Sequence, residues 1–275
     1  CSVEHVCEPV EARHAEIFAK YPRVKAIDTD FAATLARPEV EAVVLATPAD
    51  AHFAQVRQAL LAGKHVFVEK PMARTAAEAR ELAQLARQTG RTLMVGHTFL
   101  YNDAVLWVKR FIDQGELGEP YYAYFQRLSL GQVRQDVNAL WNLAPHDVSI
   151  ANFWFGETPS RVEAQGVSFL QNGIHDVNFM SMYYPSGRFA HIHVSWLDPH
   201  KTRRAVIVGG KKMVEYDDTS TDQKIVVFDK GFDRRDAAAS RGPLPFGDFS
   251  EFVLAQRAGD IWIPKVSFRE PLQVE

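Results

Sequence analysis

Residues 42–48 read AVVLATP, and residues 65–71 read HVFVEKP. Each segment is a short apolar run that ends at a proline, which is typical of a strand buried on both faces and stopped by a turn. Between the two runs, Phe53, Val56 and Leu60 recur at helical spacing, and Gly63 is placed to end that helix. A strand, a helix and a second strand in this order predict a parallel βαβ unit.

The same alternation extends over residues 1–102, which we predict to be one domain. Further strands are expected at residues 3–7, 24–27 and 92–95, with helices at residues 11–20 and 30–36. Thr75 and Glu78 are spaced as a capping box for another helix, which Gly90 would end. Five strands with short helical crossovers predict an α/β, Rossmann-like parallel sheet, whose ligands bind beyond the carboxyl ends of the strands.

Residues 103–275 form the second predicted domain, an α+β domain with a large open, mainly antiparallel sheet. Helices are expected at residues 103–114 and 145–155, and strands at residues 121–130, 160–169, 177–184, 188–197, 203–208, 212–216 and 224–228. Turns at Ser186-Gly187, Asp198-Pro199 and Gly209-Gly210 predict antiparallel neighbours. An uncovered apolar sheet face favours self-association, so we expect a homodimer or homotetramer.

Composition excludes several classes of protein. The chain has 275 residues, of which 47% are hydrophobic, and a net charge of -3, so it can bury a large core and offers no electrostatic footprint for nucleic acid. Nothing in the sequence resembles a membrane span or a signal peptide, and two cysteines are too few for a disulfide framework. We therefore expect a cytoplasmic protein with no membrane partner.

Polar residues follow several of the predicted strands. Glu8 comes directly after the first strand, where an acid in a dinucleotide-binding sheet accepts hydrogen bonds from ribose hydroxyls and favours NAD over NADP. From its spacing alone, Glu8 is equally well explained as a solvated acid at a strand end. His97 has the corresponding place after the strand at residues 92–95.

The Glu69-Lys70-Pro71 segment has a stronger chemical signature. Lys70 follows a buried strand, where partial desolvation and a nearby oxidised nicotinamide would lower its pKa toward a value useful for proton transfer. Glu69 could orient the lysine by ion pairing, and Pro71 would set the direction of the chain. The alternative is an exposed, salt-bridged turn.

These motifs together resemble the Gfo/Idh/MocA oxidoreductases over nearly the whole chain. The matching segments are Ala46-Thr47-Pro48, HVFVEKP at residues 65–71, Val95-Gly96-His97 and Pro145-His146-Asp147. The resemblance implies transfer of a hydride between NAD(P) and an alcohol carbon of a sugar, a nucleotide sugar or an inositol. It assigns the catalytic role to Lys70 and cofactor contacts to Glu8, Ala46, Thr47, Pro48, His52, Glu69, Lys70, Pro71 and His97.

The segment from Trp141 to Asp147 resembles the family's Asp-x-x-x-His pattern, with Asn142 in place of the Asp. Residues four apart share one face of a helix, so Asn142 and His146 can approach the same substrate hydroxyl if the helix begins early enough. Asn142 can hydrogen-bond that hydroxyl but cannot take its proton. Lys70 and His146 are therefore the proton-transfer candidates, while Asp147 is equally well explained as a helix cap.

Other charged residues of the second domain have open interpretations. Arg127 and Arg134 flank the loop before Asn142 and are weaker candidates for a substrate pocket. Lys201, Arg203 and Arg204 could meet a phosphate of the substrate or simply line the rim of the sheet. His191 and His193 share one face of a strand, where an oligomer interface or polar pairing is favoured over a metal site, so no metal is expected.

Two other functions remain open at this point. A related enzyme class uses a similar fold with retained NAD to cleave glycosidic bonds, without net formation of NADH. A family member without catalysis would bind a nucleotide or sugar only, although the intact Glu69-Lys70-Pro71 and Pro145-His146-Asp147 segments argue against it. The motifs do not distinguish among inositols, sugars and nucleotide sugars, nor the direction of reaction.

The distribution of glycine predicts that the chain is a fragment. There are 16 glycines and the first is Gly63, whereas average usage would place roughly 3 or 4 before it. If residues 3–7 are the second strand of the Rossmann sheet, the glycine-rich phosphate turn lies upstream of Cys1. The end of the sequence at Glu275 likewise suggests a missing C-terminal helix.

This interpretation predicts that the 275-residue chain binds NAD weakly, because no phosphate-cradling glycine turn is present in it. Isothermal titration calorimetry of the purified chain with NAD should give little or no binding heat. Tight binding in that titration would contradict the inference drawn from the glycines.

Overall fold

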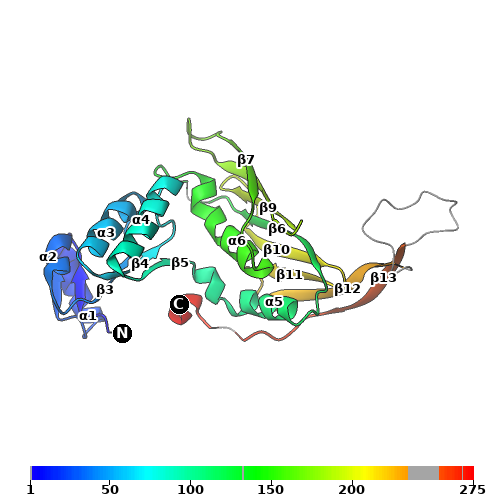
Figure 1. Cartoon of the computed structure of the whole chain (residues 1–275), viewed down its shortest axis with the longest axis horizontal. Helices are drawn as coiled ribbons and strands as arrows, with labels where there is room; N and C mark the ends of the chain where they lie inside the picture. The colour runs from blue at the N-terminus through cyan, green and yellow to red at the C-terminus, as the bar shows by residue number, and fades with distance from the viewer. Residues whose placement is uncertain (1, 132, 235–253, 268) are drawn as a thin grey trace. The chain divides into compact units, whose positions relative to one another are not determined.

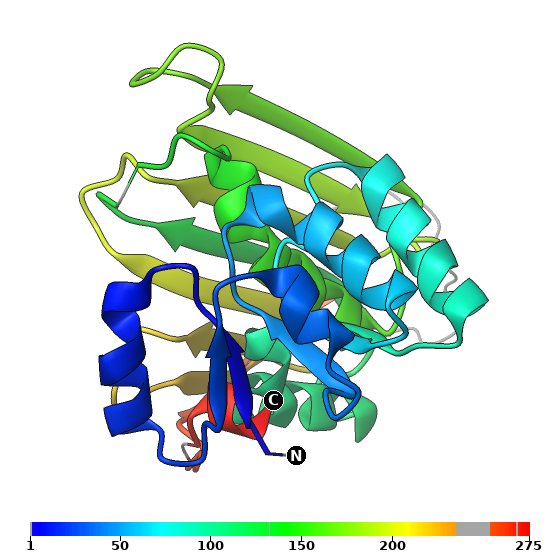
Figure 2. The ribbon, with the colours of Figure 1, turned by 90° about the vertical axis from the view of Figure 1, so that its left-hand side faces the viewer.

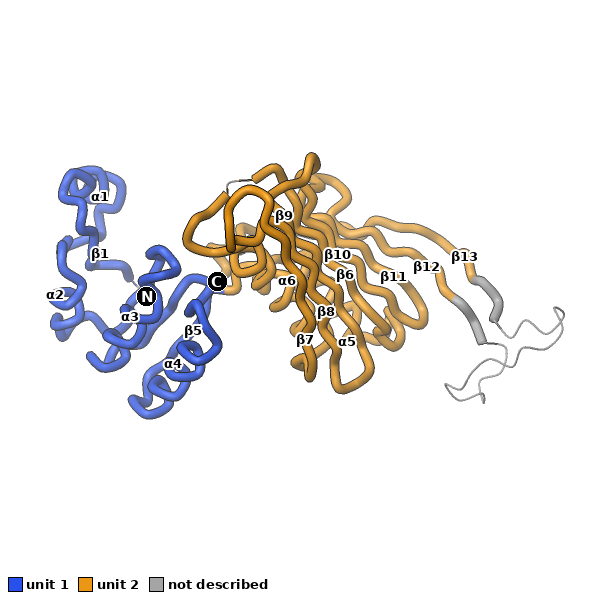
Figure 3. Tube along the Cα trace, turned by 90° about the horizontal axis from the view of Figure 1, so that it is seen from above, with its two compact units in different colours: residues 1–96 blue, residues 97–275 orange. Residues whose placement is uncertain are grey.

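The computed structural model describes residues 2–131, 133–234, 254–267 and 269–275. The chain divides into two compact units, Cys1–Gly96 and His97–Glu275, which are coloured separately in Figure 3. The first unit alternates short strands with helices, and the second is built on a large sheet. This is the predicted combination of a Rossmann-like parallel domain with an open-sheet domain.

Every strand pair in the first unit is parallel, as predicted, but the strands form two sheets instead of one. β1 pairs with β2, and β4 lies between β3 and β5. In the doubly wound order 3-2-1-4-5-6, the second and fourth strands flank the first strand and do not pair with each other. The bounds are His5–Cys7 for β1, Ala26–Asp28 for β2, Ala42–Leu45 for β3, His65–Glu69 for β4 and Leu93–Gly96 for β5.

Helices connect these strands, and Figure 2 shows them beside the sheets of the first unit. They are η1 (Glu11–Arg13), α1 (His14–Lys20), α2 (Phe31–Ala36), α3 (Ala49–Leu61) and α4 (Ala76–Thr89). The predicted capping box is confirmed: Thr75 accepts from the backbone N–H of Glu78, and the Glu78 carboxylate accepts from the backbone N–H of Thr75. Val56 and Leu60 of α3 and Leu82 of α4 pack with Val66 and Val68 of β4 in one buried cluster.

The second unit contains an eight-stranded sheet in the order β13-β12-β11-β10-β6-β9-β8-β7 (Figure 1). Each pair of neighbouring strands in this sheet is antiparallel, except the pair of β6 and β9, which is parallel. The strands are β6 (Pro120–Leu128), β7 (Arg161–Val167), β8 (Val177–Tyr183), β9 (Phe189–Ser195), β10 (Thr202–Gly209), β11 (Met213–Asp217), β12 (Ile225–Arg234) and β13 (Leu254–Trp262). β13 was not predicted.

One predicted turn joins strands that are not neighbours. Asp198-Pro199 lies between β9 and β10, but β6 lies between these two strands in the sheet and pairs with both. The other two turns do join antiparallel neighbours, β8 with β9 and β10 with β11. Turn residues mark where a strand ends, whereas the neighbour of a strand is chosen by packing over the whole sheet.

Three helices and a helical turn complete the second unit: η2 (Thr98–Tyr101), α5 (Asp103–Asp113), α6 (Ala139–Phe155) and α7 (Pro271–Val274). The prediction that α6 starts near Pro145 is wrong, because the helix begins earlier, at Ala139. Asn138 caps it by accepting from the backbone N–H of Trp141 at 3.0 Å. Packing of a 17-residue helix against β6, β8 and β9 offsets the hydrogen bond that Pro145 cannot donate.

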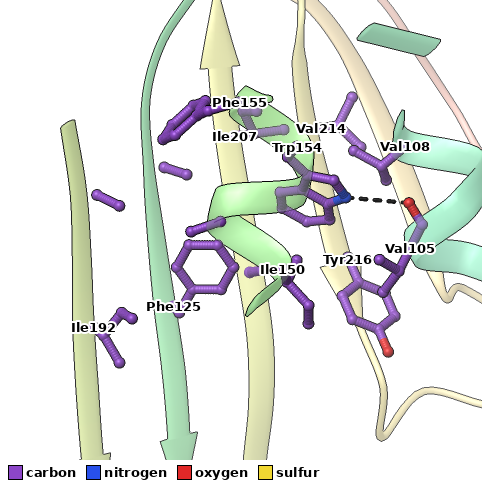
Figure 4. Packing of buried hydrophobic residues seen from close by; sticks show 14 of the residues in the cluster. Val105, Val108, Phe125, Ile150, Trp154, Phe155, Ile192, Ile207, Val214 and Tyr216 are labelled. Atoms are coloured by element: carbon purple, nitrogen blue, oxygen red, sulfur yellow. Dashed lines mark hydrogen bonds between the residues drawn. The ribbon is translucent and has the colours of Figure 1, made fainter. Parts of the chain in front are cut away.

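The core of the second unit lies between α6 and the sheet (Figure 4). Trp154 of α6 packs on Phe125 of β6 with ring centroids 5.7 Å apart, and its indole N–H donates to the carbonyl of Val105 in α5 at 3.1 Å. Ile150 and Ile192 are buried in the same cluster. These contacts hold α5 and α6 against one face of the sheet and give α6 a defined rotation about its axis.

The opposite face of this sheet, which we call the open face, carries partly exposed aromatic and histidine side chains. The register places Gln126, His193 and Phe179 in one row across β6, β9 and β8, and Tyr122, Phe189 and Tyr183 in another. Phe179 is 43% exposed and stacks on His193 with ring centroids 4.3 Å apart. Burial lowers the pKa of His193.

Among the helices of the described ranges, none is both long enough and apolar enough to cross a membrane.

Candidate functional site

The carboxyl ends of the strands in the first unit carry most of the predicted site residues. Glu8 follows β1, Ala46, Thr47 and Pro48 follow β3, and Glu69, Lys70 and Pro71 end β4 and begin the next turn. Because β3, β4 and β5 are parallel neighbours, the turns after β3 and β4 lie at the same edge of one sheet. His97 follows β5 and begins the second unit, where it precedes η2.

Glu8 is held by groups of the turn that follows it. Its carboxylate accepts from the backbone N–H of Val10 at 2.9 Å and from the guanidinium of Arg13 at 3.3 Å. The hydrogen bond from Val10 and the bond from Arg13 hold the pKa of Glu8 below its usual range. The group is therefore an ionised acceptor at neutral pH. Arg13 is a cation beside this acid that sequence reasoning did not identify.

His52 was expected to touch the cofactor, and that contact stays a prediction. Its ring is buried in the first turn of α3, and both ring nitrogens lie near backbone carbonyl oxygens. Nδ1 is 2.7 Å from the carbonyl oxygen of Pro71, and Nε2 is 2.8 Å from that of Thr47. A ring engaged at both nitrogens reaches a ligand only through the turns that it contacts.

The turn that contains Lys70 is supported on the side of β5 as well. Glu69 is opposite Gly96 in the parallel ladder, and a Cβ placed on Gly96 would lie 3.2 Å from Oε1 of Glu69. The glutamate side chain therefore lies over the glycine at the end of β5. Lys70 is half-buried, and the Lys70-Pro71 peptide bond is cis.

In the second unit, α6 carries Asn142 and His146. The helix already begins at Ala139, so the two residues lie one turn apart on the same face, as their spacing required. The ring of His146 packs against Phe99 of η2 with centroids 4.7 Å apart. Its backbone carbonyl accepts from the hydroxyl of Ser149 at 2.7 Å.

Two interpretations of charged residues need correction, because Asp147 and Arg127 form a buried ion pair. Arg127 of β6 donates to both carboxylate oxygens of Asp147, at 2.8 and 3.1 Å, and the two side chains are 8% and 5% exposed. Asp147 therefore does not cap α6, and Arg127 is not available to a substrate. The guanidinium also lies over the ring of Phe99, 4.5 Å from its centroid.

Three of the remaining charged candidates, all arginines, are paired within the protein. Arg134 forms a two-point ion pair with Asp136, while Arg203 pairs with Asp218 and Arg204 with Glu215. The interpretation of Arg203 and Arg204 as charges along the sheet is therefore favoured over a phosphate contact. Within the ranges that the structure describes, no group of three or more His, Cys, Asp or Glu residues is arranged to hold a metal ion.

A groove of about 800 Å³ runs along the outer side of α6, and sequence reasoning missed it. Its walls are mainly apolar and come from α6 and the neighbouring β8 and η2; they include Leu140, Trp141, Val148, Phe153, Met180 and Leu100. The polar residues His97, Ser149 and Asn152 also line the groove. Asn142 and His146 lie on the adjacent face of the same helix. The signal in the sequence was the apolar outer face of α6, which becomes apparent once the helix is extended back to Ala139.

Comparison with known proteins gives a family for both units. Residues 2–97 match the family described as "Oxidoreductase family, NAD-binding Rossmann fold", and residues 105–215 match the "GFO/IDH/MocA C-terminal domain". The uncharacterized oxidoreductase YdgJ of Escherichia coli is 30% identical over 223 residues, which are 74% of this chain and 63% of that protein. The chain thus spans less than two thirds of this relative's length.

Solved structures with the same architecture include two at 25% sequence identity. An oxidoreductase from Magnetospirillum magnetotacticum superimposes with a TM-score of 0.77 over 100% of this chain and 81% of its own. UDP-N-acetylglucosamine 3-dehydrogenase GnnA from Acidithiobacillus ferrooxidans gives 0.70 over 95% of this chain and 74% of its own.

Replacing Arg127 with Met should lower the free energy of unfolding by about 3–5 kcal/mol, because Asp147 would keep a buried charge without its partner. Urea unfolding at neutral pH, followed by tryptophan fluorescence, measures this. Arg161→Met breaks the exposed pair with Glu163 and serves as the control, with an expected loss of less than about 1 kcal/mol.

The double variant Arg127→Met with Asp147→Leu should recover most of that loss, since it removes both charges together. Equal losses in Arg127→Met and Arg161→Met would show that the buried pair contributes nothing special to the fold.

Proposed function

Because the chain belongs to the Gfo/Idh/MocA family of oxidoreductases, whose N-terminal domain is an NAD-binding Rossmann fold, we propose that it oxidises or reduces an alcohol carbon of a sugar-type substrate. The observation that carries this proposal is the position of Lys70, which directly follows a buried parallel strand and lies beside the turn that contains Thr47 and Pro48. Ligands of open parallel sheets bind at this edge.

The residues at these strand ends fit a dinucleotide. Glu8 is an ionised acceptor suited to ribose hydroxyls, as the family's NAD-dependent members require. Arg13, 3.3 Å from Glu8, is a cation at the same strand end and would suit the 2′-phosphate of NADP as a second cofactor. When bound, the nicotinamide accepts a hydride from the substrate carbon or returns one to it.

Proton transfer is the part of the reaction that this chain's own side chains perform. As an alcohol is oxidised, its hydroxyl proton must pass to a base, and Lys70 and His146 are the two candidates. Asn142 hydrogen-bonds the same class of hydroxyl and orients it, but its amide cannot accept the proton. In reduction, the same lysine or histidine returns the proton to the carbonyl oxygen.

The substrates that we favour are sugars and nucleotide sugars, with inositols as a third class. The related GnnA acts, by its name, on a nucleotide sugar. The groove of about 800 Å³ along α6 has room for a ligand of drug size, for which pockets have volumes of about 300–1,000 Å³.

Lys70→Met should lower kcat at least about 100-fold, because general acid–base groups typically contribute a factor of 10²–10⁴. Formation of NADH from NAD, measured by absorbance in the full-length protein across a panel of inositols, aldoses and nucleotide sugars, gives the rate. His146→Gln tests the second candidate in the same assay. Lys20→Met, on α1, is the control and should keep full activity.

Full activity in Lys70→Met would contradict the proposed mechanism. Cleavage of a glycosidic bond without net NADH would identify the chain as a glycosidase that retains its NAD. Binding of a sugar or nucleotide without either reaction would identify a non-catalytic member of the family.

A second proposal concerns assembly: the open face joins two copies of the chain in a homodimer, or four in a homotetramer. Phe179, Tyr122 and Tyr183 provide its apolar area. Phe179→Asp should shift the mass measured by light scattering toward a monomer, because a charge in a buried interface must be desolvated. Leu61→Asp, at an exposed apolar residue of α3, should leave the mass unchanged. A monomeric wild-type chain would contradict this proposal.

A further inference from the structure

His52 is a buried polar side chain of the first unit for which the proposed reaction has no use. It is 1% exposed and lies in the first turn of α3, behind the edge where β3 and β4 end. Burying an imidazole ring costs free energy unless its nitrogens are hydrogen-bonded. Both of its nitrogens are engaged, at 2.7 Å from the carbonyl oxygen of Pro71 and at 2.8 Å from that of Thr47.

Both contacts are made to hydrogen-bond acceptors. A backbone carbonyl oxygen only accepts hydrogen bonds, so a His52 nitrogen that carries a hydrogen donates to the carbonyl beside it; a neutral ring donates to one turn and packs against the other. The two nitrogens lie on opposite sides of a rigid five-membered ring, which lets one side chain span the distance between two carbonyl groups. An aliphatic side chain of similar size would fill the space without linking the turns.

The link lies where the sheet stops holding the two turns together. The ladder between β3 and β4 ends with the pair Leu45 and Val68, and the next residues leave the sheet as separate turns. On the other side, Glu69 is still paired with Gly96. Lys70 therefore lies between Glu69, held by the ladder, and Pro71, whose carbonyl is held by His52.

We propose that His52 is a positioning residue that holds the backbone on the C-terminal side of Lys70 and so fixes where the lysine side chain originates. This inference rests on the proposed function of Lys70 and deepens it. His52 contacts neither substrate nor cofactor in this role. It acts through the Pro71 carbonyl, and it ties the lysine turn to the Thr47 turn, so that both move as one unit.

The first arm of the test needs no substrate. Hydrogen–deuterium exchange with mass spectrometry reports the opening of peptides that cover residues 70–76. His52→Ala should raise the exchange rate of those peptides at least ~10-fold, and added imidazole, which fits the space left by the side chain, should restore protection. Val56→Ala is the matched control, because Val56 is buried one turn further along the same helix and makes no such link.

The proposed link between the two turns is contradicted if these peptides exchange at the wild-type rate in His52→Ala, or if Val56→Ala raises their exchange rate equally. His52→Asn covers the case in which the alanine variant does not fold. It keeps one amide donor but cannot span both carbonyls, so intermediate protection is expected.

The second arm measures the consequence for the reaction, with the compound from the panel that gives the highest rate. His52→Ala should lower kcat by about 10–100-fold, because small displacements of a catalytic group have effects of this size. KM should change less than about twofold, and imidazole should restore part of kcat. A structural role alone would lower the amount of active protein without a response to imidazole, and Val56→Ala would do the same.

An unchanged kcat in His52→Ala would overturn the positioning role even if the exchange rates change. If the full-length wild-type protein oxidises or reduces no compound of the panel, the proposed function fails. In that case the exchange measurement alone decides whether His52 holds the turn.

Discussion

The buried ion pair between Arg127 and Asp147 constrains how α6 lies on the sheet of the second unit. It joins a strand in the middle of the sheet to α6, the helix that carries Asn142 and His146. Two desolvated charges are costly unless they meet in a good geometry, so the pair strongly favours one position of the helix on the sheet. Phe99 lies over the guanidinium and against His146, which extends this constraint to the histidine ring.

The two units share one arrangement, which is built from different side chains. In each, the candidate for proton transfer directly precedes a residue held by a buried polar contact. Lys70 precedes Pro71, whose carbonyl contacts His52, and His146 precedes Asp147, which pairs with Arg127. A reacting group must be held to within a fraction of an ångström, and a neighbouring residue fixed in the core restrains the backbone from which such a group extends.

The sequence predicted best where a local pattern has a single physical explanation. Apolar runs ended by proline gave β3 and β4, and the spacing of Thr75 and Glu78 gave the capping box of α4. It predicted less well where the deciding partner is distant. Arg127 and Asp147 are 20 residues apart with no periodicity between them, and the start of α6 depends on packing that outweighs Pro145. The contact of His52 with Pro71 spans 19 residues and has no sequence signature.

By itself, the sequence determined the order of the elements, the class of each unit and the set of polar residues at the strand ends. These follow from side-chain periodicity and from turn residues, which act over a few positions along the chain. Only the tertiary structure decided which of those residues pair with another residue of the protein. His52, Asp147 and Arg127 were all candidates for ligand or helix-end contacts, and burial gave each a protein partner. Partner choice depends on three-dimensional proximity and on the cost of leaving a buried polar group unpaired, which no short stretch of sequence contains.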